Sequence, residues 1–184
     1  MNFHKKKLIL VGAATRNLGK TTFVERLIKK FSSKFSIVGL KIKTIYKNDN
    51  FFHGKGRSLL KKNFEIIEET NTKNSEDTNR MLKNGASRVF MIRCFSDFLG
   101  LAFNEFLKKI DEKNFIVCES NSLRKFVKPD VFILIKHKTK IEIKPSAKKL
   151  EKYANLFIFS DGKNFDKNIN EIGLKIKNSV WKLI

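Results

Sequence analysis

The run GAATRNLGKTTF (12–23) constrains the fold most, because it joins two segments with different periodicity. Before it, KLILVG (7–12) has the apolar composition of a buried strand. After it, KTTFVERLIKKF (20–31) places apolar residues at helical spacing. A strand, a glycine-containing turn and a helix that begins at a lysine form the framework of a phosphate-binding loop, in which backbone N–H groups face phosphate oxygens. The sequence therefore predicts a nucleotide phosphate site.

The loop departs from the usual G-x-x-x-x-G-K-[ST] spacing at one position, where Ala14 replaces the first glycine. Alanine can turn the chain out of the strand if its φ stays negative, whereas Gly19 has no Cβ and lets the backbone approach phosphate. We expect Lys20 to reach the β- and γ-phosphates and to act in catalysis, Thr21 to bind Mg²⁺ through its hydroxyl, and Thr22 to contact the α-phosphate. The alternative is an ordinary strand–turn–helix in which a threonine caps the helix.

A magnesium site needs ligands beyond one hydroxyl, and FIVCE (115–119) supplies a carboxylate at the end of an apolar segment. Ligands of open α/β sheets gather at the carboxyl ends of the strands, so we expect Glu119 to bind the metal or to position water in catalysis. Asp161 also follows an apolar segment, but SDG is first a turn pattern. Arg16 lies inside the loop and can contact phosphate in its own subunit or in a dimer partner; a solvated side chain is the preferred interpretation.

Apolar segments recur along the chain at intervals typical of alternating strands and helices. LILV, FIVC and VFILI are apolar at every position, which is typical of parallel strands covered on both faces. We expect one α/β domain over 1–184, with three layers and a mostly parallel central sheet. Strands are expected at 7–12, 35–44, 64–69, 87–94, 114–120, 130–136 and 155–162, and helices at 20–31, 75–86, 96–110, 145–154 and 165–184. The second helix is expected to be capped by Ser75 and to end at Gly85.

The net charge of +21 has two interpretations. A nucleic-acid-binding surface is one of them. Lysine supplies 32 of the 39 basic residues (39 less seven arginines), and Asn, Ile and Phe are also frequent, as A/T-rich codons would produce. A base-reading protein favours arginine, and no RRM, KH or helix-turn-helix pattern accompanies the lysines. Compositional drift is therefore preferred, and nucleic acid is not expected as a partner.

The cysteines and the hydropathy pattern indicate a cytoplasmic protein. Cys94 and Cys118 lie in apolar segments without metal-binding spacing, as expected for buried thiols in a reducing compartment. The N-terminal residues imitate a signal peptide, but the apolar stretch Leu8 to Val11 is too short for one. No segment approaches the roughly 20 apolar residues of a membrane-spanning helix, so no membrane partner is expected.

Two further segments resemble a known family. EDTNRMLKNGA (76–86) is similar to a K-D-S/T-x-R-x-x-x-x-G-A segment, and VCES (117–120) is similar to a strand that leads to VEG. With the loop, they resemble molybdopterin-guanine dinucleotide biosynthesis protein B (MobB) over roughly residues 7–136. The resemblance implies a P-loop NTPase fold of the SIMIBI type. It also implies a GTP-binding, weakly hydrolysing adapter in molybdenum cofactor biosynthesis, often dimeric and acting with a partner enzyme.

Under this resemblance Asp77 and Arg80 would lie near the γ-phosphate or the substrate, and Lys41 would be the basic residue that ends the second strand. Thr21 would hold Mg²⁺, and Glu119 would support the metal's ligands or act in catalysis. The expected nucleotide-binding residues are Thr15, Arg16, Asn17, Leu18, Gly19, Lys20, Thr21, Thr22, Lys41, Asp77 and Arg80.

The chain also departs from the family pattern. Ser120 stands where a glycine is usual, and the histidine-rich stretch after the second strand is reduced to His53. We interpret His53 as a loop residue rather than as a metal ligand. No N-K-x-D guanine motif occurs, so the nucleotide can be GTP or ATP. GAATRNLGKT is similar to the loop of dethiobiotin synthetase-like proteins as well, which leaves an ATP-dependent kinase or ligase as the alternative.

Overall fold

In the computed structural model, seven strands form one sheet in the order β3-β4-β2-β5-β1-β6-β7, and every neighbouring pair is parallel except β3 and β4. The structure describes residues 3–46, 60, 62–139, 143 and 145–184. The strands are β1 (Phe3–Ala13), β2 (Ile37–Ile45), β3 (Phe64–Glu69), β4 (Arg88–Phe95), β5 (Phe115–Glu119), β6 (Val127–His137), β7 (Leu156–Ser160), β8 (Leu174–Lys177) and β9 (Val180–Leu183). The α-helices are α1 (Lys20–Ser32), α2 (Asp77–Lys83), α3 (Leu99–Leu107) and α4 (Pro145–Lys148).

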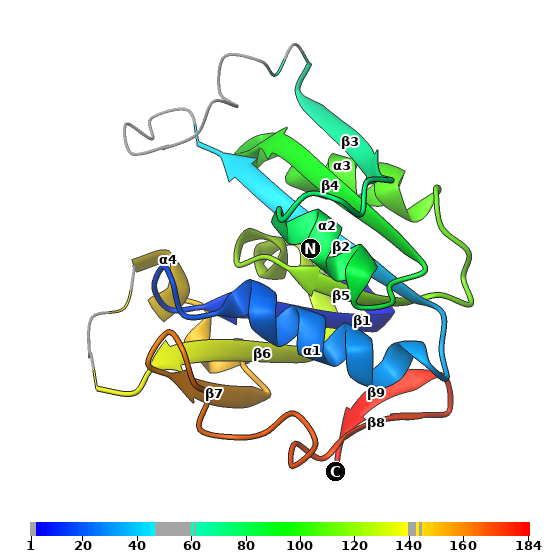
Figure 1. Cartoon of the computed structure of the whole chain (residues 1–184). Coiled ribbons are helices and arrows are strands. Elements are labelled where there is room, and N and C mark those ends of the chain that lie inside the picture. The colour runs from blue at the N-terminus through cyan, green and yellow to red at the C-terminus, as the bar shows by residue number, and fades with distance from the viewer. Residues whose placement is uncertain (1–2, 47–59, 61, 140–142, 144) are drawn as a thin grey trace.

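Helices cover both faces of this sheet: α1 and α2 lie in front of it and α3 lies behind it (Figure 1). Successive strand residues point to opposite faces. In β1, Ile9 and Val11 therefore join the core under α1, while Leu8 and Leu10 join the core under α3. The expected α/β class and the mostly parallel sheet between helical layers are confirmed.

The helix α1 forms where the apolar spacing predicts it. Its buried face carries Phe23, Val24, Leu27, Ile28 and Phe31, and Lys29 and Lys30 fall in its last turn, where cations interact favourably with the helix dipole. Burial of this face against β1 and β5 fixes where the N-terminus of the helix stands. That terminus meets the carboxyl ends of the parallel strands.

The expected helix over 165–184 is wrong, because the end of the chain is an antiparallel hairpin of β8 and β9. Asn178 and Ser179 connect the strands with φ values of 51° and 57°. Positive φ at both central residues is the requirement of a two-residue type I′ turn, which matches the twist of a hairpin. Leu174 and Ile176 lie two positions apart, as residues on one face of a strand do. Ile176 also lies at helical spacing from Ile169 and Ile172, and this spacing imitates a helix.

Three smaller differences concern helix ends. The cap of α2 is Glu76 in a capping box with Asn79, not Ser75, and the helix ends at Lys83, two residues before Gly85, whose φ is 96°. The expected helix 96–110 begins with the 3₁₀ turn η1 (Ser96–Phe98). The expected helix 145–154 divides into α4 and the 3₁₀ turn η3 (Glu151–Tyr153).

His53 lies outside the residues that the structure describes.

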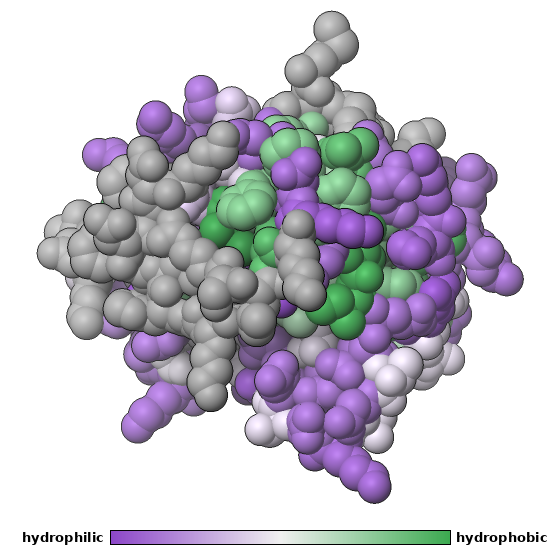
Figure 2. Space-filling view, turned by 90° about the horizontal axis from the view of Figure 1, so that it is seen from above, coloured by the Kyte–Doolittle hydropathy of each residue, from purple (hydrophilic) through white to green (hydrophobic). Residues whose placement is uncertain are grey.

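Hydrophilic residues cover much of the surface. The view from above shows them around a central area of hydrophobic residues (Figure 2). Among the helices in the described part of the chain, none is long and apolar enough to cross a membrane.

Candidate functional site

The loop between β1 and α1 joins a parallel strand to a helix through Gly19. Gly19 adopts a φ of 75° immediately before α1, and its carbonyl accepts the hydrogen bond of Phe23 N–H at 2.9 Å. A residue with a Cβ would be strained at this φ. Ala14 is buried, keeps a negative φ and donates its N–H to the Ile135 carbonyl at 2.8 Å. The alanine therefore replaces the first glycine of the motif without backbone strain.

Asn121 fixes the entrance of the loop. Its Oδ1 accepts the N–H of Ala13 and its Nδ2 donates to the carbonyl of Ala13, both at 2.8 Å. A Cβ on Gly12 would lie 2.8 Å from Asn121 Oδ1, so glycine is needed for this approach. No local sequence pattern indicates this role, because Asn121 lies 108 positions from Ala13 in the chain.

A turn after β7 supports the other end of the loop. A Cβ on Gly162, whose φ is 95°, would lie 2.9 Å from the Asn17 carbonyl oxygen, and the ring of Phe165 packs beside Gly19. Asp161 accepts the backbone N–H groups of Lys163 and Asn164 at 2.8 and 2.7 Å. These bonds lower the pKa of Asp161 to about 2, and the residue serves the turn as its sequence context indicates.

Four elements bring their charged side chains together at the start of α1. Glu119, only 2% exposed, ends β5, and its Oε2 accepts the hydroxyl of Thr21 at 2.9 Å. Its Oε1 forms an ion pair with Lys41 of β2 and lies 3.6 Å from Lys20 Nζ. Lys41 Nζ also lies 2.8 Å from the Asp77 carboxylate of α2. The register of the sheet brings Lys41 and Glu119 together, because Glu119 of β5 is paired with Lys41 of β2.

The electrostatics of this cluster differ between its two lysines. Burial lowers the pKa of Lys20, and the attraction of Glu119 only partly opposes it. Burial also acts against the charge of Lys41, but Glu119 and Asp77 outweigh it and raise the pKa of that lysine. Burial would raise the pKa of Asp77, yet Lys41 lowers it below the ordinary value of 3.8. Lys41 is therefore held firmly as a cation, while the charge of Lys20 is incompletely compensated.

Asp77 should give the fold an acid-sensitive contribution to stability. A carboxylate whose pKa is depressed by folding stabilises above its unfolded pKa and loses that contribution as the pH falls through the folded value. We expect Asp77→Asn to lower the urea midpoint of unfolding at pH 7, and we expect this loss to shrink steadily as the pH falls below 3.8, the ordinary pKa of this group, towards the lower folded value. Asp111→Asn, on an exposed loop, is the matched control. An equal loss at neutral and acidic pH would contradict the ion pair with Lys41.

A second ion pair lies one helical turn away. Arg80 Nε lies 2.6 Å from Glu25 Oε1, and its Nη2 donates to Glu25 Oε2 at 3.1 Å and to the hydroxyl of Thr22 at 3.3 Å. Glu25 is buried on α1, and burial raises its pKa although Arg80 opposes this. The arrangement directs Arg80 of α2 to the first turn of α1. Sequence reasoning missed Glu25.

A cavity of about 370 Å³ joins these groups. Its described lining residues are Arg16, Asn17, Leu18, Gly19, Lys20, Thr21, Thr22, Asp77, Arg80 and Glu119. Thr15 is not among them, and its hydroxyl donates to the Arg16 carbonyl at 3.4 Å. The Leu18 side chain belongs to the core, so only its backbone can serve a ligand, and Lys41 lines the adjoining cavity of about 200 Å³.

The possible metal ligands at the site are few. Thr21 offers a hydroxyl and Glu119 a carboxylate, which are oxygen ligands of the type that Mg²⁺ prefers. Within the described ranges, no group of three or more His, Cys, Asp and Glu residues could hold a metal ion. A magnesium ion here would thus depend on oxygens from a ligand and from water, as Mg²⁺ commonly does beside phosphates.

Comparisons with known proteins add no relative. No protein-family model matches the chain, and no curated protein or solved structure matches it.

Proposed function

We propose that this protein binds a nucleoside triphosphate with Mg²⁺ and acts as a slow NTP hydrolase or adapter with a P-loop NTPase fold of the SIMIBI type. The observation that carries the proposal is the convergence of Lys20, the Thr21 hydroxyl and the buried Glu119 carboxylate at the N-terminus of α1. A helix N-terminus with unpaired N–H groups favours an anion, and the adjoining cavity is open to the loop.

Each residue has a role that its position supports. The loop backbone and the first N–H groups of α1 hold the phosphates, and Lys20 turns from Glu119 toward them. Thr21 and Glu119 hold Mg²⁺, which would neutralise phosphate charge. Glu119 also orients the attacking water. Arg80, held between Glu25 and Thr22, faces the same cavity and can contact a terminal phosphate.

The resemblance to MobB supports the same assignment. The segment that carries it forms α2, and its Asp77 and Arg80 both line the cavity of the loop. A place in molybdenum cofactor biosynthesis is the part of the proposal that rests on the resemblance alone. Ser120, which replaces the usual glycine, accepts the N–H of Leu123 at 3.2 Å and lies two residues before the 3₁₀ turn η2 (Ser122–Lys125). The chain after Glu119 therefore follows a path set by this serine.

Titration with fluorescent ATP and GTP, each with magnesium and with EDTA, tests the proposal. We expect saturable binding of one or both nucleotides that weakens about tenfold or more without magnesium, because the metal offsets repulsion between the phosphates and Glu119. No binding of either nucleotide in the presence of magnesium would overturn the proposal. Phosphate release that begins only when a small acceptor is added would favour the kinase or ligase alternative.

A further inference from the structure

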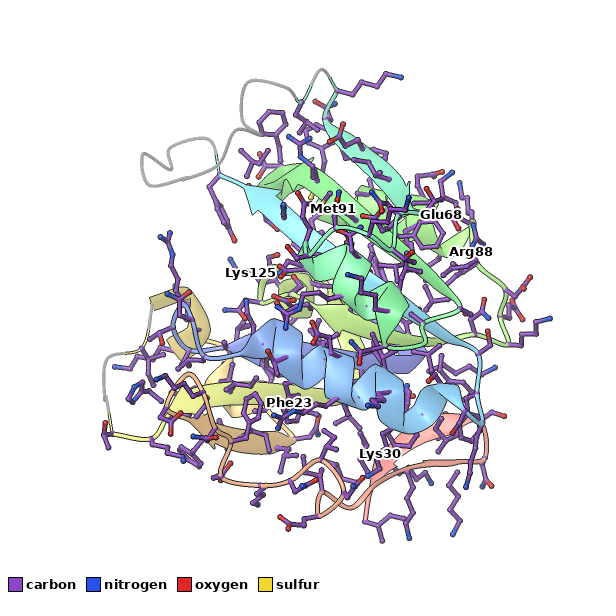
Figure 3. All side chains as sticks on the ribbon, in the orientation of Figure 1. Phe23, Lys30, Glu68, Arg88, Met91 and Lys125 are labelled. Atoms are coloured by element: carbon purple, nitrogen blue, oxygen red, sulfur yellow. The ribbon has the colours of Figure 1, made fainter. Side chains whose placement is uncertain are left out.

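A second charged cavity lies away from the phosphate loop, between η2 and the segment of α4 and η3. Its volume is about 560 Å³, and it shares no lining residue with the cavity of the loop. Lys125, which stands on its rim, is labelled in Figure 3. The described residues that line it are Arg124, Lys125, Lys148, Lys149, Leu150, Lys152 and Tyr153. Five of these seven are basic and none is acidic.

The four lysines of this cavity form no ion pair with a described carboxylate, although Lys125 and Lys152 lie 5.7 and 5.1 Å from the ring centres of Tyr46 and Tyr153, and some other lysines do form ion pairs. Lys108, for example, lies 2.6 Å from Glu105, and Lys136 lies 2.7 Å from Glu151. Lys125, Lys148, Lys149 and Lys152 are all exposed, and none forms an ion pair with an acidic residue of the described chain. Glu151, the acid within the same segment, is committed to Lys136 outside the cavity. The described lining of this cavity therefore gathers four lysines without a carboxylate.

Arg124 distinguishes the cavity from a chance cluster of lysines. Its side chain is buried, with 7% of the residue exposed, and its Nε has no hydrogen-bond partner. The guanidinium makes one long hydrogen bond, from Nη1 to the Val127 carbonyl at 3.4 Å, and stacks 4.4 Å from the ring centre of Tyr153. Arg80 and Arg88, by contrast, each pair with a carboxylate. A buried guanidinium without a counter-charge is costly, which indicates that an anion completes its surroundings.

We propose that this cavity binds a small polyanion that carries two or more phosphate groups. The planar guanidinium of Arg124, oriented by Tyr153, matches phosphate oxygens, and the rim lysines add charge that one phosphate alone would not balance. The volume falls in the range of small-molecule sites, about 300–1,000 Å³, and suits a compact ligand rather than a long polymer. The site is independent of the proposed nucleotide site.

Calorimetric titration with inorganic tripolyphosphate tests the proposal in a Lys20→Ala background, which removes the lysine of the loop. We expect tripolyphosphate to bind at physiological salt, and Lys149→Gln with Lys152→Gln to weaken it about tenfold or more. Lys175→Gln with Lys177→Gln removes the same charge from the exposed strand β8 and is the matched control, with an expected change of about twofold or less. Absence of binding, or an equal loss in both double variants, would overturn the proposal.

Two further measurements test the role of the buried arginine and distinguish a small polyphosphate from RNA as the ligand. Arg124→Lys keeps the charge but loses the planar fork, and it should weaken binding more than the control pair does if circular dichroism shows a folded protein. If it does not fold, the two lysine pairs still decide the question. A short single-stranded RNA, titrated in parallel, should bind more weakly than tripolyphosphate. Tighter RNA binding that depends on Lys149 and Lys152 would overturn the assignment to a small ligand.

Discussion

Replacement of Lys20 by methionine should lower the affinity for a nucleoside triphosphate by about a hundredfold, or about 2.8 kcal/mol, and should leave the unfolding free energy unchanged or slightly higher. The two effects have one cause. Folding lowers the pKa of Lys20 because burial disfavours its charge, so the charged form costs stability at neutral pH, and an apolar side chain of similar length removes that cost. The same ammonium is the group that would meet the phosphates.

Lys29→Met is the matched control, because this lysine lies on the same helix but is exposed in the last turn, far from the loop. It should change neither affinity nor stability appreciably. Binding by titration and unfolding by urea, measured on the same preparations, separate the two effects. Equal binding by wild type and Lys20→Met would remove the basis of the proposed site, whereas lost binding together with lost stability would indicate damage to the fold.

Replacement of Trp181 by alanine should lower the unfolding free energy by about 3–5 kcal/mol, the usual cost of removing a large buried aromatic side chain. Trp181 is 2% exposed in β9, and its ring meets those of Phe31 and Phe115 at 4.8 and 5.4 Å. It therefore closes the core under α1. Urea unfolding followed by circular dichroism gives the loss directly.

The neighbouring Val180 makes this experiment a test of the hairpin. If the end of the chain were helical, as its apolar spacing predicts, Val180 would lie on the buried stripe and Trp181 beside it. In the hairpin Val180 is only partly buried, so Val180→Ala should cost about 1 kcal/mol or less. A larger loss for Val180→Ala than for Trp181→Ala would contradict the hairpin.

The sequence predicts the framework of the candidate site well, because local patterns and one topological rule determine it. The strand, Gly19 and the start of α1 follow from their spacing. The rule that carboxyl ends of parallel strands meet at one edge points to Glu119, and in the structure its carboxylate accepts the Thr21 hydroxyl at 2.9 Å. The family resemblance points to Lys41 and Asp77, and both lie in the same cluster.

The features that sequence reasoning missed depend on contacts between distant segments. Asn121 forms two hydrogen bonds with the backbone of Ala13. These two residues come close only when β1 and β5 pair in the sheet. Glu25 lies on a helix that is otherwise amphipathic, and only the arrival of α2 makes its carboxylate a partner of Arg80. The terminal hairpin was missed because residues at alternating positions can coincide with helical spacing over a few turns, and only the turn at Asn178 separates the two patterns.

The balance of charge in the proposed nucleotide site has a kinetic consequence. Apart from the exposed Arg16, the charged side chains of the cluster are three cations and three carboxylates, namely Lys20, Lys41, Arg80, Glu25, Asp77 and Glu119. A cluster with equal numbers of positive and negative charges attracts a distant triphosphate only weakly. The net charge of +21 of the whole chain must therefore supply the long-range attraction that steers the ligand to the site. Added salt should therefore slow nucleotide association steeply while it changes the dissociation rate little.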